Sequence, residues 1–304
     1  MINRYRYKDS VWIDLLSPTS EEILAISEEF SIHPKIADEL TTPSIKSRVE
    51  LEKDSIYLIL HFPSFRHSHS EHIKQEVDFI IGKNYLITAR YETIDAIEKF
   101  SKIVEVNAIL DRGFAEDCTG VLFFGVIEEI YHSLFNELEY IESWVGKIED
   151  GIFTGKEKQM VFALSEVSRT LLNFKKATDF HNEALESLNI FGKKVFDDHF
   201  SYHVRRILDE YSKVKNSLIN NQASVAELRE TNNALLSSKQ NEIMKNLTIM
   251  AFVTYPLTLI AAIFGMNATF MPIAGKANDF WIIIILMLLA TTTFFIYFKH
   301  KKWF

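Results

Sequence analysis

Two long uncharged segments near the C-terminal end restrict the possible folds of this 304-residue chain more than any other feature. Thirty residues without a charge lie between Lys245 and Lys276, and residues 247–264 within them are almost wholly apolar. A second uncharged segment of 19 residues runs from Phe280 to Phe298. Both have the length of about 20 residues that a helix needs to cross a bilayer. We therefore predict two transmembrane helices rather than two buried core helices.

Basic residues flank the two predicted spans on the same side. Lys245 precedes the first span and residues 299–302, Lys-His-Lys-Lys, follow the second. The connection between the spans carries only Lys276 and Asp279. Because cytosolic flanks are enriched in Lys and Arg, we expect an integral protein of the cell (inner) membrane with both termini in the cytosol.

The residues before Lys245 form a separate, acidic part of formal charge −12, whereas residues 245–304 carry +4. Nucleic-acid binding needs a basic surface, so a nucleic-acid partner is not expected. An acidic body suits a protein that gathers or senses cations, although many ordinary soluble domains are equally acidic. Cys118 is the only cysteine, which excludes an intrachain disulfide and suits a cytosolic body.

The N-terminal third has the pattern of an α/β domain, predicted for residues 1–115. Short apolar runs rich in β-branched and aromatic residues alternate with turn residues and helix starts at Ser20 and His33-Pro34. We expect strands at Val11–Leu16, Ile56–Phe62, Val77–Ile81 and Tyr85–Ala89.

Four histidines lie in or beside a polar run that connects two of these strands, namely His61, His67, His69 and His72. Histidine clusters can bind transition metals. The spacing is irregular and no cysteine joins the cluster, so a solvated loop is the better interpretation.

Two long antiparallel helices are predicted for residues 116–192. Apolar residues recur at helical spacing from Gly120 to Ile190, and Gly151–Gly155 forms a natural break between the helices. The charged faces of these helices are rich in acids, which usually means solvated surface.

A stretch of 63 residues without Gly or Pro, between Gly192 and Pro256, permits one very long helix. At 1.5 Å per residue it would extend about 95 Å. We predict a cytosolic stalk helix at residues 193–246 that continues into the first transmembrane helix at 247–267. Its apolar residues fall at alternating three- and four-residue steps, so it needs helical partners from the same chain or from other copies.

The same stepping continues into the first span as a stripe of mostly small or weakly polar residues. Close packing of helices and lining of a pore both explain such a stripe. Pro256 removes one helical hydrogen bond in mid-span and predicts a bend. The stripe consists of Asn241, Met244, Thr248, Ala251, Tyr255, Thr258, Ala262 and Gly265.

The first span ends in Gly265-Met266-Asn267, and a short connection at residues 268–279 containing Met271-Pro272 leads to the second span at 280–298 and a basic tail at 299–304. This arrangement resembles the CorA family of magnesium transporters. The tripeptide alone is weakly specific, and its place at the end of the first of two C-terminal spans is what makes it informative. The resemblance is strong over residues 240–304. Before residue 240 it rests only on the order of the predicted parts, an α/β domain followed by long helices.

The resemblance implies a funnel-shaped homopentameric divalent-cation channel embedded in membrane lipid. Five copies of Asn267 would present amide carbonyls to a hydrated Mg²⁺ ion, with Gly265 and Met266 shaping the backbone. Mg²⁺ prefers octahedral oxygen ligation and loses its water reluctantly, which suits a ring of neutral oxygens. The resemblance also favours pore lining over packing for the stripe and adds Leu247, which with Met244 forms an apolar constriction.

Three departures from the family pattern leave the preferred ion open, one of them being Tyr255, which is large for a pore-facing position. Phe264 stands where the family often has Tyr, and Ile273-Ala274 replaces the Glu-Leu that many members carry after Met-Pro. In a pentamer that Glu would form a ring of five carboxylates, so its absence removes negative charge from the mouth of the pore. Transport of Zn²⁺, Co²⁺ or Ni²⁺ by the same fold, with or without proton coupling, is therefore an alternative, as is a non-conducting membrane-anchored cation sensor or scaffold.

The family is gated by divalent ions that bind cytosolic carboxylates between subunits. Asp197, Asp198 and Asp209 are candidate ligands for such a regulatory ion, although ordinary surface acids are the better interpretation. No nucleotide-binding Gly-rich loop, Ser/His/Asp arrangement or clustered zinc site is present, so neither an enzyme nor an organic cofactor is expected.

Overall fold

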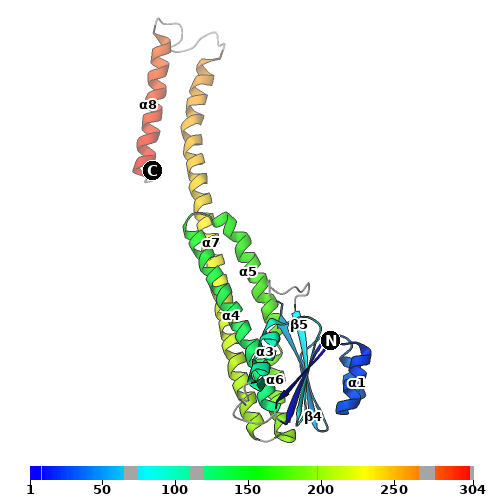
Figure 1. The fold of residues 1–304 in the computed structure, drawn as a ribbon. Coiled ribbons are helices and arrows are strands. Elements are labelled where there is room, and N and C mark those ends of the chain that lie inside the picture. The colour runs from blue at the N-terminus through cyan, green and yellow to red at the C-terminus, as the bar shows by residue number, and fades with distance from the viewer. Residues whose placement is uncertain (8, 65–73, 110–118, 197, 267–277, 302–304) are drawn as a thin grey trace. The chain divides into compact units, whose positions relative to one another are not determined.

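The computed structural model describes residues 1–7, 9–64, 74–109, 119–196, 198–266 and 278–301. The chain divides into two compact units, Met1–Arg229 and Glu230–Phe304. The first unit is built on a mixed sheet covered by helices, and the second contains the end of the long helix α7 and helix α8 (Figure 1).

The sheet has six strands in the order β1-β2-β6-β5-β4-β3. Strands β2 and β6 are parallel, with Val11 opposite Tyr85, and every other neighbouring pair is antiparallel. The four predicted strands are confirmed, whereas the edge strands β1 and β3 were not predicted. The bounds are β1 Ile2–Tyr7, β2 Ser10–Leu16, β3 Arg48–Glu52, β4 Ser55–Pro63, β5 Lys74–Ile81 and β6 Tyr85–Arg90.

Two short helices, α1 (Ser20–Phe30) and α2 (Pro34–Glu39), cover one face of the sheet (Figure 1). Helix α1 begins with a capping box, in which Glu22 N donates to Thr19 Oγ1 and Thr19 N donates to Glu22 Oε2. Apolar residues of α1 and α2 then bury against alternate strand positions. This core contains Ile13, Leu15, Ile23, Ile26, Ile36, Leu40, Tyr57, Ile59, Ile80, Ile87 and Ala89.

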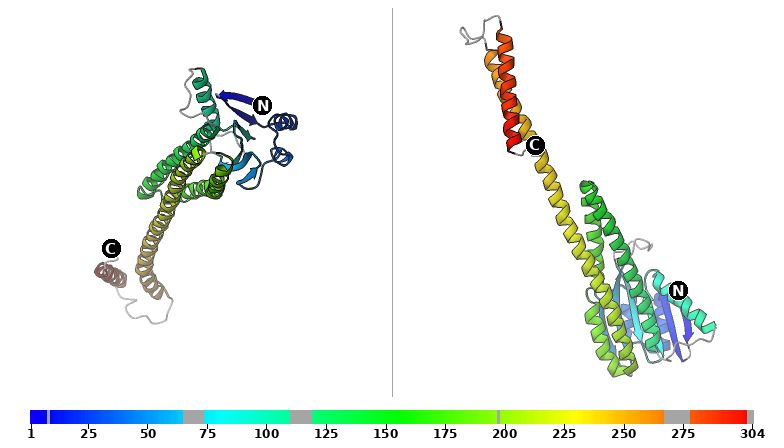
Figure 2. Two further views of the ribbon diagram at one scale, coloured as in Figure 1. Left: turned by 90° about the horizontal axis from the view of Figure 1, so that it is seen from below. Right: turned by 90° about the vertical axis from the view of Figure 1, so that its left-hand side faces the viewer.

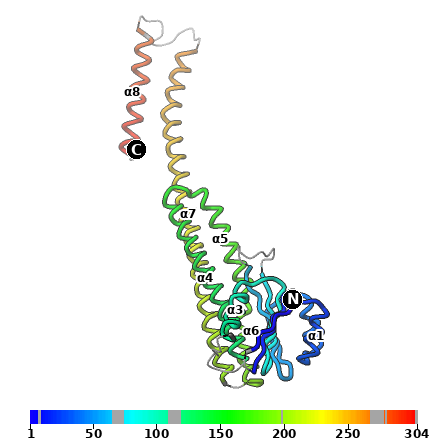
Figure 3. The backbone as a smooth tube through the Cα atoms, in the orientation of Figure 1, coloured from blue at the N-terminus to red at the C-terminus, as the bar shows by residue number. Residues whose placement is uncertain are grey.

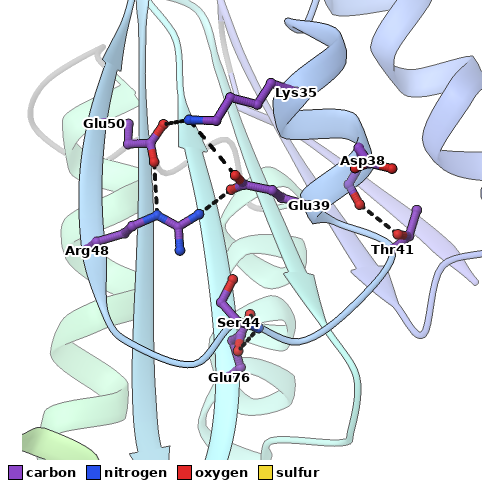
Figure 4. A network of polar contacts seen from close by, with 8 residues as sticks. All are labelled: Lys35, Asp38, Glu39, Thr41, Ser44, Arg48, Glu50 and Glu76. Atoms are coloured by element: carbon purple, nitrogen blue, oxygen red, sulfur yellow. Dashed lines mark hydrogen bonds and ion pairs between the residues drawn. The ribbon is translucent and has the colours of Figure 1, made fainter.

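Ion pairs connect α2 to the edge strand β3 (Figure 4). Lys35 Nζ lies 2.6 Å from Glu50 Oε2, and Arg48 pairs with both Glu50 and Glu39. These side chains are partly exposed, so each pair adds little stability by itself. Together they hold the edge of the sheet beneath α2.

Helices cover the opposite face of the sheet, which is visible in both Figure 1 and Figure 2. Figure 3 traces the chain through them in sequence order. The break near Gly151–Gly155 is present, but the predicted second long helix is two helices separated at Asp179-Phe180. The bounds are α3 Asp95–Ile109, α4 Thr119–Phe153, α5 Glu157–Thr178 and α6 His181–Val195.

Helix α7 (Asp198–Phe264) is the predicted very long helix, continuous through Pro256. In the first unit it packs along α4, where the rings of Tyr131 and Tyr211 are 6.0 Å apart. Asn221 Nδ2, which interrupts the apolar seam, donates to the carbonyl oxygen of Leu138 at 3.5 Å and to that of Ser217 at 3.0 Å. The partners of the seam in this unit are therefore the chain's own helices.

The second unit holds the end of α7 and helix α8 (Asp279–His300). Both helices contain an 18-residue window that is long and apolar enough to cross a membrane. Only 6% of the α7 window and none of the α8 window is buried, unlike the core helices of soluble proteins. Their apolar surfaces therefore need lipid or further protein around them.

Candidate functional site

The Gly-Met-Asn tripeptide begins directly after the last residue of α7, Phe264. Gly265 N continues the helical pattern with a 2.9 Å hydrogen bond to the Ala261 carbonyl, and Met266 N closes a tighter turn onto Ile263 at 3.3 Å. Met266 is exposed, and Asn267 lies outside the described residues. The tripeptide thus follows a helix C-terminus, where backbone carbonyls lack helical partners and can face a cation.

The predicted stripe of α7 is largely uncovered. Its larger members Met244, Leu247 and Tyr255 are 55%, 52% and 74% exposed, whereas Thr248 and Ala251 are half-buried. The remaining exposed members are Asn241, Thr258, Ala262 and Gly265. A second copy of the chain or a water-filled path can therefore reach this surface.

Helix α8 packs on a different face of α7. The rings of Phe252 and Phe298 are 6.1 Å apart, and Ile249 and Phe298 are almost fully buried. At 100° per residue, Ile249 lies about 140° and Phe252 about 80° from the centre of the stripe. The intrachain helix contact therefore lies beside the stripe, most of whose members stay exposed.

Threonine hydroxyls along α7 bond to their own helix. Thr248, Thr254 and Thr258 donate to the carbonyls four residues earlier at 2.7, 2.9 and 2.8 Å. Such hydroxyls need no partner outside the helix and tolerate lipid.

The predicted regulatory acids are only partly described. Asp209 is an exposed residue of α7, Asp198 is the first residue of that helix, and Asp197 lies outside the described residues. Within the described ranges, no three or more His, Cys, Asp or Glu side chains of one chain are grouped so that they could hold a metal ion.

His61 is a buried residue of strand β4. Its ring lies 3.0 Å from Glu76 Oε2, 3.0 Å from the Ser44 carbonyl and 3.1 Å from Ser47 Oγ. Both ring nitrogens are thus occupied inside the first unit. The other histidines of the cluster, His67, His69 and His72, lie outside the described residues.

Sequence reasoning missed the buried polar groups of the first unit. Arg90 Nη2 lies 2.8 Å from Asp14 Oδ2, and both residues are 1% exposed. Burial lowers the pKa of His181 to about 4, so this ring is neutral at pH 7. Burial and the neighbouring Glu76 raise the pKa of Asp78 well above its usual range. The sequence signal for Asp14, Asp78 and Arg90 is a charged residue within an otherwise apolar strand.

Known proteins of one family are similar to this chain over nearly its whole length. A family model described as CorA-like Mg²⁺ transporter protein matches residues 7–300. The cobalt/magnesium transport protein CorA of Thermotoga maritima is 23% identical over 301 residues, which cover 98% of this chain and 85% of that protein.

Two solved structures share the fold. The complete CorA magnesium transporter of Methanocaldococcus jannaschii superposes with a TM-score of 0.84 at 22% identity, covering 97% of this chain and 92% of that one. The full-length CmaX protein superposes with a TM-score of 0.75 at 13% identity, covering 97% and 89%.

Proposed function

Because the chain belongs to the CorA-like Mg²⁺ transporter family, we propose that it assembles as a homopentameric channel that carries Mg²⁺ across the cell membrane into the cytosol. The observation that carries this proposal is the place of Gly265-Met266-Asn267, directly after the end of a helix whose last part is apolar enough to span a bilayer. In the proposed assembly, the first spans surround the pore and α8 packs outside them.

Selection takes place at the ring of Asn267 side chains. Neutral amide oxygens accept hydrogen bonds from the water shell of Mg²⁺ without removing it, and they hold the ion weakly enough to release it. Gly265 and Met266 set the spacing of this ring at the helix end. Both termini are cytosolic, because Lys245 and the basic tail flank the spans on one side.

Entry is passive. An inside-negative potential favours influx of a divalent ion by about 4.6 kcal/mol per 100 mV, which needs no separate energy source. Cytosolic Mg²⁺ bound at acids such as Asp197, Asp198 and Asp209 of adjacent subunits closes the channel when the ion is abundant. The exposed position of Asp209 on α7 supports this role.

Cobalt or another transition-metal ion is the second candidate cargo, because the name of the Thermotoga maritima relative includes cobalt. Ile273 follows Met271-Pro272 where many family members have Glu, so the pore entrance lacks the negative charge that this Glu would supply. A non-conducting sensor or scaffold is the alternative of another class, and it predicts that Asn267 is dispensable.

Flux into liposomes tests the proposal. Purified protein is reconstituted, and entry of Mg²⁺, Co²⁺, Ni²⁺ and Zn²⁺ is followed for wild type, Asn267→Ala and the control Asn278→Ala, which changes an asparagine outside the tripeptide. We expect Mg²⁺ entry in wild type and control and its loss in Asn267→Ala.

Unchanged flux in Asn267→Ala contradicts the selectivity role, and no flux of any ion in wild type favours the scaffold. Native mass spectrometry in detergent is the parallel measurement, with a mass five times that of one chain expected. A monomer contradicts the channel.

A further inference from the structure

Strand β5 carries two buried acids, Glu76 and Asp78, which are 6% and 1% exposed. They lie on either side of Val77, so both side chains project from one face of the sheet. That face is the one covered by α1 and α2, because Asp78 is paired with Ile59 of the core beneath those helices. Acids buried this deeply need hydrogen-bond partners.

Glu76 has its partners and accepts from them as a carboxylate. The backbone N–H of Ser44 donates to its two oxygens at 2.9 and 2.7 Å, and Nε2 of His61 lies 3.0 Å from Oε2. Nε2 also lies 3.0 Å from the carbonyl oxygen of Ser44, which can only accept, so Nε2 carries a hydrogen. Glu76 is therefore the ionised member of the two acids.

Asp78 has no such partners. No hydrogen-bond donor among the described residues reaches either of its oxygens. The carboxylate of Glu76 is within hydrogen-bonding reach, but an ionised carboxylate can only accept. A hydrogen bond between the two acids consequently requires a proton on Asp78.

Little positive charge reaches Asp78 from the neighbouring strand and helix. Arg48 of β3 attracts it, but this guanidinium is already paired with Glu50 and with Glu39 of α2. Glu39 and Glu76 both add negative charge. Burial and the carboxylate of Glu76 raise the pKa of Asp78 well above its usual range, which agrees with a bound proton.

Two phenols also face the pair, and neither supplies charge. Burial raises the pKa of Tyr57 on β4 and the pKa of Tyr91 after β6, so both keep their protons at pH 7. The hydroxyl of Tyr91 donates to the carbonyl oxygen of Leu40 at 3.3 Å. Neither hydroxyl bonds to Asp78.

The connection between α2 and β3, residues 41–47, is attached to this pair of acids. Its anchor is the double contact of the Ser44 N–H with Glu76. The same connection reaches the start of α6, where Nζ of Lys46 lies 5.5 Å from the centre of the Phe180 ring. A displacement of Glu76 therefore changes a segment that contacts three elements of the first unit.

We propose that Glu76 and Asp78 form a buried proton-binding site, in which a proton on Asp78 bridges the two carboxyl groups and keeps residues 41–47 closed on the sheet. When Asp78 loses this proton, two negative charges face each other away from water, and Glu76 separates from Asp78 together with Ser44. The first unit thereby responds to pH. The inference goes beyond the proposed transport and does not depend on it.

The direction of the response follows from the raised pKa of Asp78. The folded chain binds the proton more tightly than the unfolded chain does, so the stability that it contributes is complete below about pH 4. This stability is lost as the pH rises through the folded-state pKa. Residues 41–47 are accordingly closed at low pH and open at high pH.

Infrared spectroscopy of the full chain in detergent detects the proton, because the carbonyl group of a protonated acid absorbs apart from carboxylates and amides. At pH 7 the band should be present in wild type and missing in Asp78→Asn. Asp54→Asn, which changes an exposed acid in the turn between β3 and β4, is the control and should keep the band. Identical spectra of wild type and Asp78→Asn in this region overturn the proposal.

Hydrogen exchange of residues 41–47 tests the response of the connection. As the pH rises, the infrared band of wild type and the protection of these amides should be lost with one midpoint. Above it, exchange should be at least about tenfold faster in wild type than in Asp78→Asn at the same pH, since the variant cannot ionise. A band that persists to pH 10, or its loss with no change in exchange, overturns the proposal. The wild-type titration gives this result even where Asp78→Asn does not fold.

Discussion

The Nε2 atom of His181 lies 2.7 Å from the carbonyl oxygen of His61, which joins the start of α6 to strand β4 across 120 residues of sequence. The other ring nitrogen, Nδ1, lies 2.9 Å from the hydroxyl of Tyr131 on α4. One neutral imidazole thus links two helices to the sheet. Because the ring is fully buried, protonation disrupts this arrangement.

We expect His181 to make the stability of the first unit depend on pH. Its pKa is about 4 when folded and about 6.5 when unfolded, so between these values only the unfolded state binds the proton. Stability is fully present above pH 6.5 and is lost as the pH falls towards 4, by about 2–3 kcal/mol.

Urea unfolding of the full chain in detergent, followed by tryptophan fluorescence at pH 4.5, 5.5 and 7, measures this effect. His181→Gln keeps hydrogen-bonding groups and does not titrate, so its stability should fall less over the same range. Asp78, whose pKa is raised, contributes equally to both proteins and cancels in the comparison. Identical pH profiles contradict the prediction.

Asp14→Ala should be strongly destabilising. The substitution removes the buried carboxylate partner of Arg90 and leaves only the partly exposed Glu98, at a cost of about 3 kcal/mol. The exposed pair of Arg4 and Glu29 is the control, and Glu29→Ala should cost less than about 1 kcal/mol. Urea midpoints of the full chain give both values, and similar losses in the two variants contradict the assignment.

Two glycines of α4 should respond with opposite signs to alanine. At Gly125 a Cβ would lie 2.3 Å from the buried Phe100 ring of α3, so Gly125→Ala should destabilise the protein by about 1–3 kcal/mol. At Gly146 a Cβ meets nothing within 4 Å, so Gly146→Ala should stabilise it by about 0.5–1 kcal/mol. Thermal unfolding of the two variants checks this. Phe100→Leu should restore part of the loss in the Gly125 variant.

Asp209→Asn should weaken regulation by cytosolic Mg²⁺ if this acid is a ligand of the proposed regulatory ion. Removal of one carboxylate lowers the affinity for a hard cation, so about tenfold more Mg²⁺ should be needed to protect the protein from trypsin. Glu149→Gln, which changes an exposed acid on α4, is the control. The same Mg²⁺ midpoint in wild type and Asp209→Asn removes Asp209 from the set of ligands.

Most of the secondary structure was predictable from local patterns. Strands β2, β4, β5 and β6 are apolar runs that indicate burial, and the part of α7 before Pro256 follows from the absence of Gly and Pro. The edge strands β1 and β3 lack such an apolar run. Their sequences are Ile-Asn-Arg-Tyr-Arg-Tyr and Arg-Val-Glu-Leu-Glu. They are strands because a neighbouring strand pairs with their backbone.

The sequence by itself determined the two apolar spans, the tripeptide after the first of them and the long helix that leads there. Hydrophobicity, length and the lack of helix breakers are local properties, and a segment too apolar for water keeps that property in any fold. Tertiary structure alone decided that Asp14 meets Arg90, that His181 meets His61, and that Phe252 of α7 meets Phe298 of α8. These relationships join residues far apart along the chain, and only packing selects the partner that satisfies a buried polar group.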